Sequence, residues 1–353
     1  MLATAFCAGV ANVNKPTVHD IAKEAGVSLA TVDRVLNARP GVRDQTIAKV
    51  NAAVDRLGYI RDTSAANLAR QRQYRFAFVL PEGPSQFVDT LRAALKEASS
   101  PRVADRLLVS IVSIPAHDPH AIVRRLRTLN PARLDGVAIM APETPQVRDA
   151  VVRLKEAGLT VVALASDLPN SSRDYFIGIN SIAAGRTAGL LMGRFNAHGG
   201  RVAVVTNSLR SRDSLERRLG FDAVMSDEFS HLNVLPTIES FDDPQRMKAA
   251  IHEVIGRHRD LVGIYSMGAG NTQIVEAIHD RSEARRLTVI AHELTPATRK
   301  ALRSGEIAAV ITQNVGHLVR SALRVLRTLS DRMPIFEAQE RVRIEIVLRE
   351  NLP

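Results

Sequence analysis

Two short motifs in the C-terminal half of the chain contain residue types that can carry enzyme chemistry. Residues 268–273 (GAGNTQ) follow an apolar run and begin like the glycine-rich turn that cradles a dinucleotide, but the third glycine of that fingerprint is missing. His292 and Glu293 begin a zinc-protease pattern in which Pro296 occupies the place of the second histidine ligand. No Ser/His/Asp set and no paired carboxylates stand out beside them. These residues predict a protein that is not an enzyme and that needs neither a cofactor nor a metal ion.

The sequence around these motifs has the pattern of a doubly wound α/β core. From Phe76 onward, apolar runs alternate with segments that carry apolar residues at helical spacing. Such runs are typical of strands buried on both faces, and the alternation indicates parallel sheets with helices on both sides. The predicted strands are residues 76–80, 107–114, 136–140, 161–165, 175–179, 202–205, 262–265, 288–291 and 308–311. A segment of this length is too long for one compact core, so we expect two lobes.

The composition is that of an ordinary globular protein. The chain has 353 residues, 45% of them hydrophobic, and no run approaches the ~18 apolar residues that a membrane span needs. The mildly apolar N-terminus has no basic start and a poor cleavage site, so residues 1–14 are expected to be a disordered tail, or to precede the true start codon, instead of forming an export signal. The single cysteine, Cys7, excludes an intrachain disulfide and thiolate-rich metal sites and fits the cytoplasm.

Basic charge is concentrated at the N-terminus. The formal net charge of the chain is +10, and residues 1–75 hold eleven Lys or Arg against six Asp or Glu, a net charge of +5. The other 278 residues supply the remaining +5. This distribution points to a polyanionic partner for the N-terminal segment.

Residues 16–59 have the pattern of three short helices. Thr17 can cap a helix with apolar residues at helical spacing up to Ala25, and Gly26 suits a tight turn at positive φ. Ser28 can cap a second helix, and a third is expected over residues 46–57. Two short helices joined through a glycine turn match a helix-turn-helix, in which the second helix reads the major groove of DNA.

The residues of this helix pair also carry a family resemblance. The stretch 17–37, TVHDIAKEAGVSLATVDRVLN, resembles the DNA-binding headpiece of the LacI/GalR family of bacterial transcriptional regulators almost residue for residue. Residues 39–43 and 57–59 continue the resemblance, and residues 67–70 resemble the hinge helix of that family. The resemblance implies a headpiece at 15–61, a linker with a hinge helix at 62–74, and an effector-binding and dimerisation core at 75–353.

The resemblance assigns base contacts to three residues of the second helix. Leu29 and Ala30 are apolar and can touch thymine methyl groups, whereas Arg34 can pair with guanine through two hydrogen bonds, unless it is only a solvated surface charge. Short polar side chains are placed to bind phosphates and to position the helix. These phosphate ligands are Thr17, Ser28, Thr31 and Asn37, of which Thr17 and Ser28 are also capping residues.

Two further positions concern how the headpiece docks. Asp33 stands where members of the family usually carry a serine near the DNA backbone, so its carboxylate is expected to pair with a nearby base such as Arg34 or Lys23. In the family, the counterpart of Leu68 wedges between base steps in the minor groove, paired with the same residue of a second subunit. The hinge is too short to be stable alone, so its folding depends on DNA and on the cores.

The core resembles ribose-type sugar-binding proteins, whose ligand lies in a cleft between two lobes. The lobes are expected at about 75–181 and 182–312, with the C-terminal segment crossing between them. When the ligand contacts of those proteins are transferred by aligning the strand ends, they fall on four polar residues whose donors and acceptors have fixed geometry. They are Arg217, Asn271, Glu293 and Gln313. Phe87 is expected as a stacking face or as core, and Asp167 as a hydroxyl acceptor or merely part of its loop.

These features predict a sequence-specific transcriptional regulator, expected to be a repressor. It binds a pseudo-palindromic DNA operator as a cytoplasmic homodimer, since no leucine heptad follows the core, and it responds to a sugar, sugar alcohol or related polar effector. No membrane partner is expected. A periplasmic solute-binding protein and a sugar-modifying enzyme are the alternatives; the headpiece argues against the first, and the missing catalytic residues argue against the second.

Overall fold

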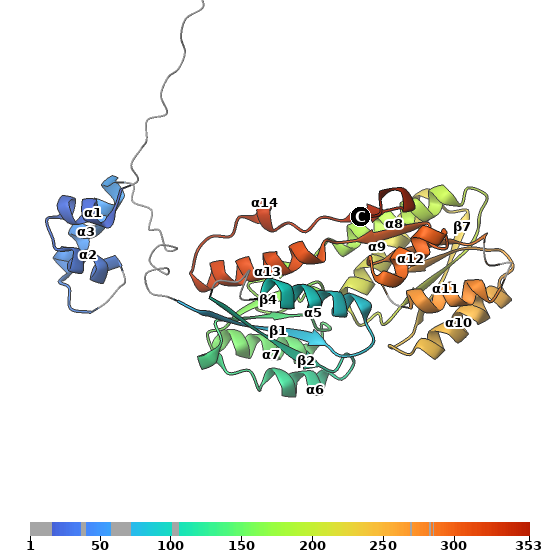
Figure 1. Ribbon diagram of the computed structural model, residues 1–353, viewed down its shortest axis with the longest axis horizontal. Helices are drawn as coiled ribbons and strands as arrows, with labels where there is room; N and C mark the ends of the chain where they lie inside the picture. The colour runs from blue at the N-terminus through green and yellow to red at the C-terminus, as the bar shows by residue number, and fades with distance from the viewer. Residues whose placement is uncertain are drawn as a thin grey trace, which may run out of the picture. The chain divides into compact units, whose positions relative to one another are not determined.

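The computed structural model describes residues 16–36, 40–57, 72–100, 106–268, 270–281, 284 and 286–353 (Figure 1). These residues form two compact units, one within residues 1–72 and the other within residues 73–353. The expected tail at 1–14, the linker around Leu68 and the expected phosphate ligand Asn37 lie outside the described residues.

The smaller unit is built from three short helices, α1 (Val18–Ala25), α2 (Leu29–Leu36) and α3 (Asp44–Leu57). Their apolar faces meet in a small core that contains Ile21, Val32 and Val50. Gly26 ends α1 at φ 64°, and its N–H group donates to the carbonyl oxygens of Ala22 and Lys23. Because a side chain is strained at this φ, the glycine allows α2 to begin only three residues later.

The larger unit consists of two lobes, each built on one sheet. The first lobe contains β1 (Tyr74–Pro81), α5 (Gln86–Ala98), β2 (Leu107–Ile114), α6 (Pro119–Leu126), β3 (Gly136–Ile139), α7 (Pro145–Glu156), β4 (Thr160–Leu164) and β5 (Tyr175–Ile177). The second contains α8 (Ser181–Phe195), β6 (Gly200–Thr206), α9 (Arg212–Glu228), β7 (Leu232–Glu239), α10 (Pro244–Arg257), β8 (Leu261–Ser266), α11 (Asn271–His279), β9 (Thr288–His292), α12 (Pro296–Ser304) and β10 (Ala309–Thr312).

The last segment of the chain passes between the lobes. Helix α13 (Val315–Ser330) follows β10 of the second lobe but packs against α5 and β4 of the first. The chain then runs through α14 (Glu337–Glu340) to β11 (Glu345–Val347), which pairs with β10. Figure 1 shows α13 and α5 together over the first sheet.

The two sheets share one strand order. The first has the order β2-β1-β3-β4-β5, and the second has β7-β6-β8-β9-β10 with β11 added at its far edge. Every strand pair is parallel except β10 and β11. In a doubly wound sheet of this order, ligands bind beyond the carboxyl ends of the strands, where the strand order reverses. The predicted α/β fold class is therefore confirmed.

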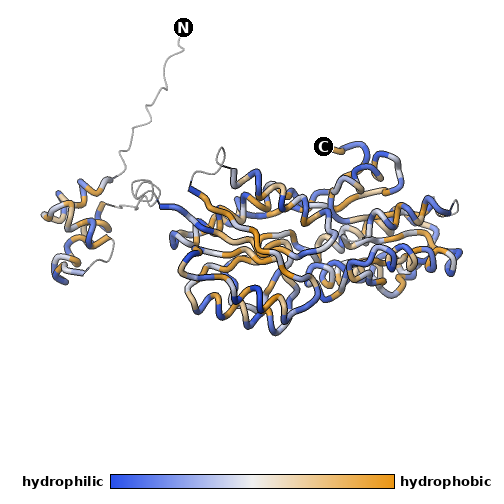
Figure 2. The backbone as a smooth tube through the Cα atoms, turned by 60° about the horizontal axis from the view of Figure 1, so that its bottom comes forward, coloured by the Kyte–Doolittle hydropathy of each residue, from blue (hydrophilic) through white to orange (hydrophobic). Residues whose placement is uncertain are grey.

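Alternating side chains of the central strands enter different cores. Phe76, Phe78 and Leu80 of β1 face α5 and α13, whereas Ala77 and Val79 face α6 and α7. The second sheet is covered in the same way, by α8 and α9 on one face and by α10, α11 and α12 on the other. Figure 2 shows the strands as the most hydrophobic part of the larger unit. Burial on both faces explains why the central strands appear as continuous apolar runs in the sequence.

The edges of the sheets depart from the sequence predictions. Strand β2 is not buried on both faces, because it is an edge strand on which Leu108 is 51% and Ile111 is 39% exposed. Strand β7 was not predicted, and it contains Pro236, which an edge strand tolerates because it has no neighbour on one side. Strand β11 was also missed; it has only three residues and pairs antiparallel.

Glycines allow α8 and α9 to pack unusually close together. A Cβ atom at Gly185 of α8 would lie 2.0 Å from the carbonyl oxygen of Arg217 in α9. In return, a Cβ atom at Gly220 would lie 2.1 Å from the carbonyl oxygen of Ile182. Since no side chain fits at either position, the two backbones are in direct contact. This contact sets the position from which Arg217 extends toward the carboxyl ends of β8 and β9.

Candidate functional site

Helix α2 presents the expected reading residues on its exposed side. Leu29, Ala30 and Arg34 are exposed, with 41% of Leu29 accessible to solvent, while Val32 is completely buried in the core of the small unit. Asp33 is exposed on the same helix. An exposed leucine beside an exposed arginine on a short helix suits contacts with base edges in a major groove.

Of the three expected phosphate ligands that the structure describes, Thr17 and Ser28 cap helices, and Thr31 is bonded to the Ser28 cap. Thr17 and Asp20 form a capping box, in which the backbone N–H group of Thr17 donates to Asp20 Oδ2 at 2.8 Å. Ser28 Oγ accepts from the backbone N–H group of Thr31 at 3.2 Å and lies 2.9 Å from Thr31 Oγ1. Thr17 and Ser28 are exposed at the amino ends of α1 and α2, where backbone N–H groups also favour a phosphate.

The lobes of the larger unit meet through segments that follow strand ends. The backbone N–H group of Ala297 donates to Gln86 Oε1 at 3.4 Å, and His117 Nε2 lies 2.7 Å from Asp242 Oδ2. A third contact joins Arg212 Nη1 to Glu143 Oε2 at 3.6 Å. Each of these contacts connects the first lobe to the second, so the carboxyl ends of the two sheets face the same junction.

Arg217, Glu293 and Gln313 are brought together at this junction from three different elements. Arg217 Nη2 donates to Glu293 Oε1 at 3.3 Å, and Gln313 Nε2 donates to the same oxygen at 3.4 Å. Arg217 Nη1 donates to the carbonyl oxygen of Met267 at 2.8 Å and lies 3.6 Å from Asp213 Oδ2. All three predicted residues are at least 95% buried. We call Arg217, Glu293 and Gln313 the polar cluster.

In the polar cluster, burial and the neighbouring charges shift each pKa in opposite directions. Burial raises the pKa of Glu293 above its usual value, although the charge of Arg217 acts against this shift. Burial alone would lower the pKa of Arg217, but Asp213 and Glu293 together raise it above its ordinary value. Arg217 is therefore charged, and it needs the neighbouring carboxylates because an unpaired charge is costly to bury.

The backbone at Glu293 is held in an unusual conformation. Its φ is 69°, in the left-handed region that a side chain other than glycine rarely adopts. Three hydrogen bonds keep it there: its N–H group donates to Ile311, and its carbonyl oxygen accepts from the Thr295 N–H group and the Thr298 hydroxyl. Ala165 follows the equivalent strand of the first lobe with φ 61°. Strain that is maintained by surrounding contacts is typical of functional sites.

Asn271 lies next to the polar cluster and is connected to it through the backbone. Its Nδ2 donates to the carbonyl oxygen of His292 at 3.2 Å, and its Oδ1 accepts from the Ser266 hydroxyl at 2.6 Å. His292 is completely buried, with its Nε2 2.8 Å from the Tyr265 hydroxyl. Burial, together with the charge of Arg217, lowers the pKa of His292 well below its usual value. This histidine is therefore neutral.

Several buried polar atoms at the junction have no hydrogen-bond partner among the described residues. In the polar cluster these are Arg217 Nε, Glu293 Oε2 and Gln313 Oε1, one from each residue. In the first lobe, Ser166 Oγ, two residues after the end of β4, is also buried and has no hydrogen-bond partner among the described residues. Buried polar atoms are normally paired, so these four are free to bind a polar ligand.

Asp167 and Phe87 do not contact the polar cluster. Asp167 binds Arg173, whose Nη2 donates to Asp167 Oδ2 at 2.7 Å while its Nε donates to Oδ1. Phe87 is partly buried at the start of α5, where it packs against the core shared by α5 and α13. The structure thus places Phe87 and Asp167 in the first lobe and the other four expected ligand residues in the second.

Glu143 and Arg212 are site residues that the sequence predictions missed. Glu143 follows β3 with a side chain only 10% exposed, and it accepts from Asn170 Nδ2 at 2.6 Å as well as pairing with Arg212. A hydrogen bond to Glu216 raises the pKa of Arg212, and Glu143 and Asp167 raise it further. The only sequence signal was that Glu143 lies three residues after the end of a predicted strand; its partner Arg212 lies in the other lobe and gives no local signal.

The described residues contain no group of three or more His, Cys, Asp or Glu side chains that could hold a metal ion. In the same part of the chain, no helix is long and apolar enough to cross a membrane.

Both units match known families. Residues 17–62 match the family described as bacterial regulatory proteins, lacI family, and residues 76–332 match the periplasmic binding protein domain. The second match covers more than half of the chain. It also spans both lobes and α13.

Similar curated proteins include two bacterial regulators. The maltose regulon regulatory protein MalI of Vibrio furnissii is 39% identical over 84 residues, which cover 24% of this chain and 61% of that protein. Catabolite control protein A of Priestia megaterium is 27% identical over 164 residues, 45% of this chain and 48% of that protein. The chain thus aligns with about half the length of the curated relatives it matches.

Among solved structures, the larger unit is similar to transport proteins. An ABC transporter solute-binding protein from Burkholderia graminis, in complex with D-arabinose, superposes with a TM-score of 0.71 and 23% identity over 80% of this chain and 97% of that one. At this identity the likeness shows the fold.

Proposed function

Because the chain belongs to the family of the periplasmic binding protein domain and carries a lacI-family DNA-binding domain, we propose that it is a ligand-controlled transcriptional repressor. It binds a pseudo-palindromic operator as a homodimer and acts in the cytoplasm, where that DNA is. One observation carries the proposal: the same chain joins an exposed reading helix to a core with unpaired polar atoms buried at its lobe junction. It has no catalytic role.

In the proposed complex, α2 lies in the major groove. Leu29 and Ala30 contact thymine methyl groups, Arg34 pairs with guanine, and the exposed amino ends of α1 and α2 bind phosphates through Thr17 and Ser28. Thr31, Asn37 and, at the operator centre, Leu68 complete the expected contacts. The positions of Thr17 and Ser28 support this role, because both are exposed at the amino end of a helix, where the helix dipole favours an anion.

The effector is a small polyhydroxylated molecule such as a sugar or sugar alcohol. The unpaired atoms of the polar cluster are one donor, Arg217 Nε, and two acceptors, Glu293 Oε2 and Gln313 Oε1. A hydroxyl group both donates and accepts, so vicinal hydroxyls can satisfy all three, which a purely apolar ligand cannot do. Asn271 supplies a further amide, and Asp167 and Phe87 face the ligand from the first lobe.

Regulation requires that the effector bind the DNA-competent and DNA-incompetent forms with different affinities. The lobes contribute different groups, so a ligand held between them changes their relative position. The linker passes this change to the headpieces. A tenfold preference of the effector for one form corresponds to about 1.4 kcal/mol of coupling.

The homodimer is supported by the first lobe. A groove of about 470 Å³ runs between α5 and the edge strand β2, lined in part by Leu95, Val109 and Ile111. Ile111, an exposed apolar side chain of β2, lines this groove, and natural proteins rarely leave an apolar sheet edge uncovered. A second copy of the chain would cover it and bring two headpieces to the two halves of the operator.

The experiment that tests the proposal is a fluorescence-anisotropy titration with the DNA upstream of the protein's own gene. We expect sequence-selective binding at physiological salt and a shift of the dissociation constant by a sugar or polyol found in a thermal-shift panel. Leu68→Ala should weaken specific binding strongly and leave nonspecific binding nearly intact. Binding without sequence selectivity would contradict the proposal.

A further inference from the structure

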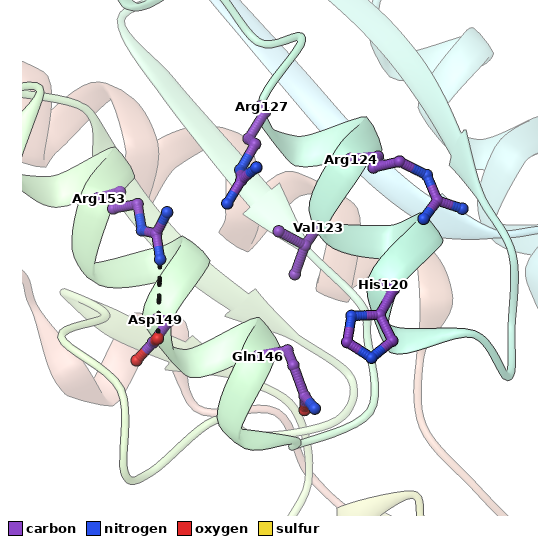
Figure 3. Close-up of a pocket in the computed structure, with 7 residues that line it drawn as sticks. All are labelled: His120, Val123, Arg124, Arg127, Gln146, Asp149 and Arg153. Atoms are coloured by element: carbon purple, nitrogen blue, oxygen red, sulfur yellow. Dashed lines mark ion pairs between the residues drawn. The ribbon is translucent and has the colours of Figure 1, made fainter.

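A second concave site lies in the first lobe, between α6 and α7. It is a groove of about 320 Å³ lined by His120, Val123, Arg124, Arg127, Gln146, Asp149 and Arg153 (Figure 3). The lining side chains come from neighbouring positions on two helices that pack side by side. None of them belongs to the polar cluster or to the reading face of α2.

Positive charge dominates this groove. Three arginines line it against one carboxylate, Asp149. Figure 3 shows Arg127 and Arg153 at one end, His120 and Gln146 at the other, and the apolar side chain of Val123 between them. The wall is thus a set of hydrogen-bond donors around a small apolar surface.

The arginines of the groove are available to an outside anion. Arg153 pairs with Asp149 at 3.7 Å and Arg124 with Asp118 at 3.8 Å, and all four side chains in these pairs are more than half exposed. Exposed pairs of this kind contribute little free energy and exchange readily. Among the described residues, no carboxylate lies within ion-pair distance of Arg127.

Helix-end electrostatics account for only part of this arrangement. A cation at the carboxyl end of a helix is stabilised by the helix dipole, which accounts for the presence of Arg124 and Arg127 at the end of α6 and of Arg153 at the end of α7. It does not explain why both helices turn their cations toward the same groove. Bringing like charges together is unfavourable unless an anion joins them.

We propose that the groove between α6 and α7 binds a small phosphate-bearing anion, separate from the effector at the lobe junction. A phosphate group can accept from two guanidinium groups at once, and Figure 3 shows the guanidinium groups of Arg127 and Arg153 on the same side of the groove. The groove volume is at the lower end for small-molecule sites, so the ligand is inorganic phosphate or a small phosphate ester. His120 and Gln146 would contact the rest of an ester.

The test is isothermal titration calorimetry on the full-length protein, with inorganic phosphate in one arm and glycerol phosphate in the other. Ionic strength is kept constant with potassium chloride. We expect saturable binding, and Arg127→Gln or Arg153→Gln should each raise the dissociation constant about tenfold. Arg303→Gln, an exposed arginine of α12 in the second lobe, is the matched control and should bind like the unaltered protein.

Comparing the two titrations shows whether the groove prefers inorganic phosphate or a phosphate ester. Equal affinity for both probes supports a site for the phosphate group alone, and tighter binding of glycerol phosphate supports an ester. The proposal is overturned if neither probe binds saturably, or if both groove variants bind normally. It is also overturned if binding is lost in Arg34→Gln instead, because the anion would then sit on the headpiece.

Discussion

At the scale of single residues, Glu293 combines three unusual properties: a left-handed backbone, burial, and a carboxylate oxygen with no partner among the described residues. Each costs free energy, and a left-handed conformation alone costs roughly 1–2 kcal/mol. A binding role explains all three together, because the strained backbone aims the carboxylate and the ligand supplies the missing hydrogen bond.

We therefore predict that Glu293→Ala abolishes the response to effector while operator affinity stays within about twofold. The substitution removes a hydrogen-bonded charge, which should weaken effector binding at least tenfold. Anisotropy titrations of operator DNA with and without the effector would measure this. Glu276→Ala, which removes an exposed carboxylate of α11, is the control and should respond normally. A Glu293→Ala protein that responds like the unaltered one would show that the polar cluster is not the effector site.

The buried His292 predicts how stability depends on pH. Its pKa lies well below 6.5 in the folded protein because of burial and the charge of Arg217. In the unfolded chain this histidine takes up a proton near its ordinary pKa, so its contribution to stability is fully present above that pH. As the pH falls below about 6.5, that contribution is lost at up to about 1.4 kcal/mol per pH unit.

Urea unfolding between pH 7.5 and 5.5 tests this against His292→Gln, which has no titrating group. The free energy of unfolding of the unaltered protein should fall more steeply with decreasing pH than that of the variant, whatever the offset between them. Parallel curves would mean that His292 takes up its proton at the same pH in the folded protein as in the unfolded chain.

Residues of the candidate site could be predicted from sequence only where they lie near the end of a predicted strand. Arg217, Glu293 and Gln313 do meet, since each follows or faces the end of a strand in one sheet. Contacts across the lobe junction were not predictable. Nothing local in the sequence indicates that Glu143 faces Arg212, or that Asp167 is already bound to Arg173.

At the scale of elements, the site depends on how closely α8 and α9 approach. We predict that Gly185→Ala lowers the free energy of unfolding by about 1–3 kcal/mol, because a side chain forced into packed backbone displaces it. The displaced segment carries Arg217, so effector affinity should fall as well. Urea unfolding measures the first effect and calorimetry with the effector measures the second.

Gly256→Ala is the matched control for this change. Gly256 also lies in a helix, α10, but a Cβ atom there would meet only the tip of Arg281 at 3.4 Å. Alanine is a better helix former than glycine by about 1 kcal/mol, so this variant should be as stable as the unaltered protein or more stable. If both variants behaved alike, close packing at Gly185 would not be the cause.

The elements themselves were largely predictable, and the exceptions share a physical reason. All nine predicted strands are present; the central ones were predictable because strands buried on both faces are continuous apolar runs, and the edge strands β2 and β5 also carry apolar runs. The missed strands β7 and β11 lie at sheet edges, where one side is free and selection for apolar residues is weak. Edge position also explains the exposed apolar residues of β2, which the sequence alone assigned to the interior.

At the scale of the whole molecule, the two lobes of the larger unit are variations on one plan. Both sheets have the same order, and the fourth strand of each is followed by a non-glycine residue in the left-handed region, Ala165 or Glu293. Unpaired buried oxygens follow these two strands, on Ser166 and on Glu293. A ligand bound at the junction would thus meet equivalent turns of the two lobes.

The equivalence of the sheets ends at their edges, where the dimer is proposed to form. The second sheet has β11 beyond β10, whereas β5, the counterpart of β10 in the first sheet, has no further strand beside it in the described chain; the β2 edge, like the equivalent β7 edge, also has no neighbouring strand there. Replacing Ile111 with glutamate would put a charge within the proposed dimer contact. Because Ile111 is 39% exposed, the substitution should leave the fold of a single chain intact.

We predict that Ile111→Glu converts the dimer to monomers in sedimentation velocity, with an unchanged circular dichroism spectrum. Operator affinity should then fall by roughly 10²-fold or more, because the second headpiece no longer benefits from the binding of the first. Leu219→Glu is the control, since Leu219 is an equally apolar and 56% exposed residue on α9. A dimer that survives Ile111→Glu but dissociates in Leu219→Glu would move the interface from the first lobe to the second.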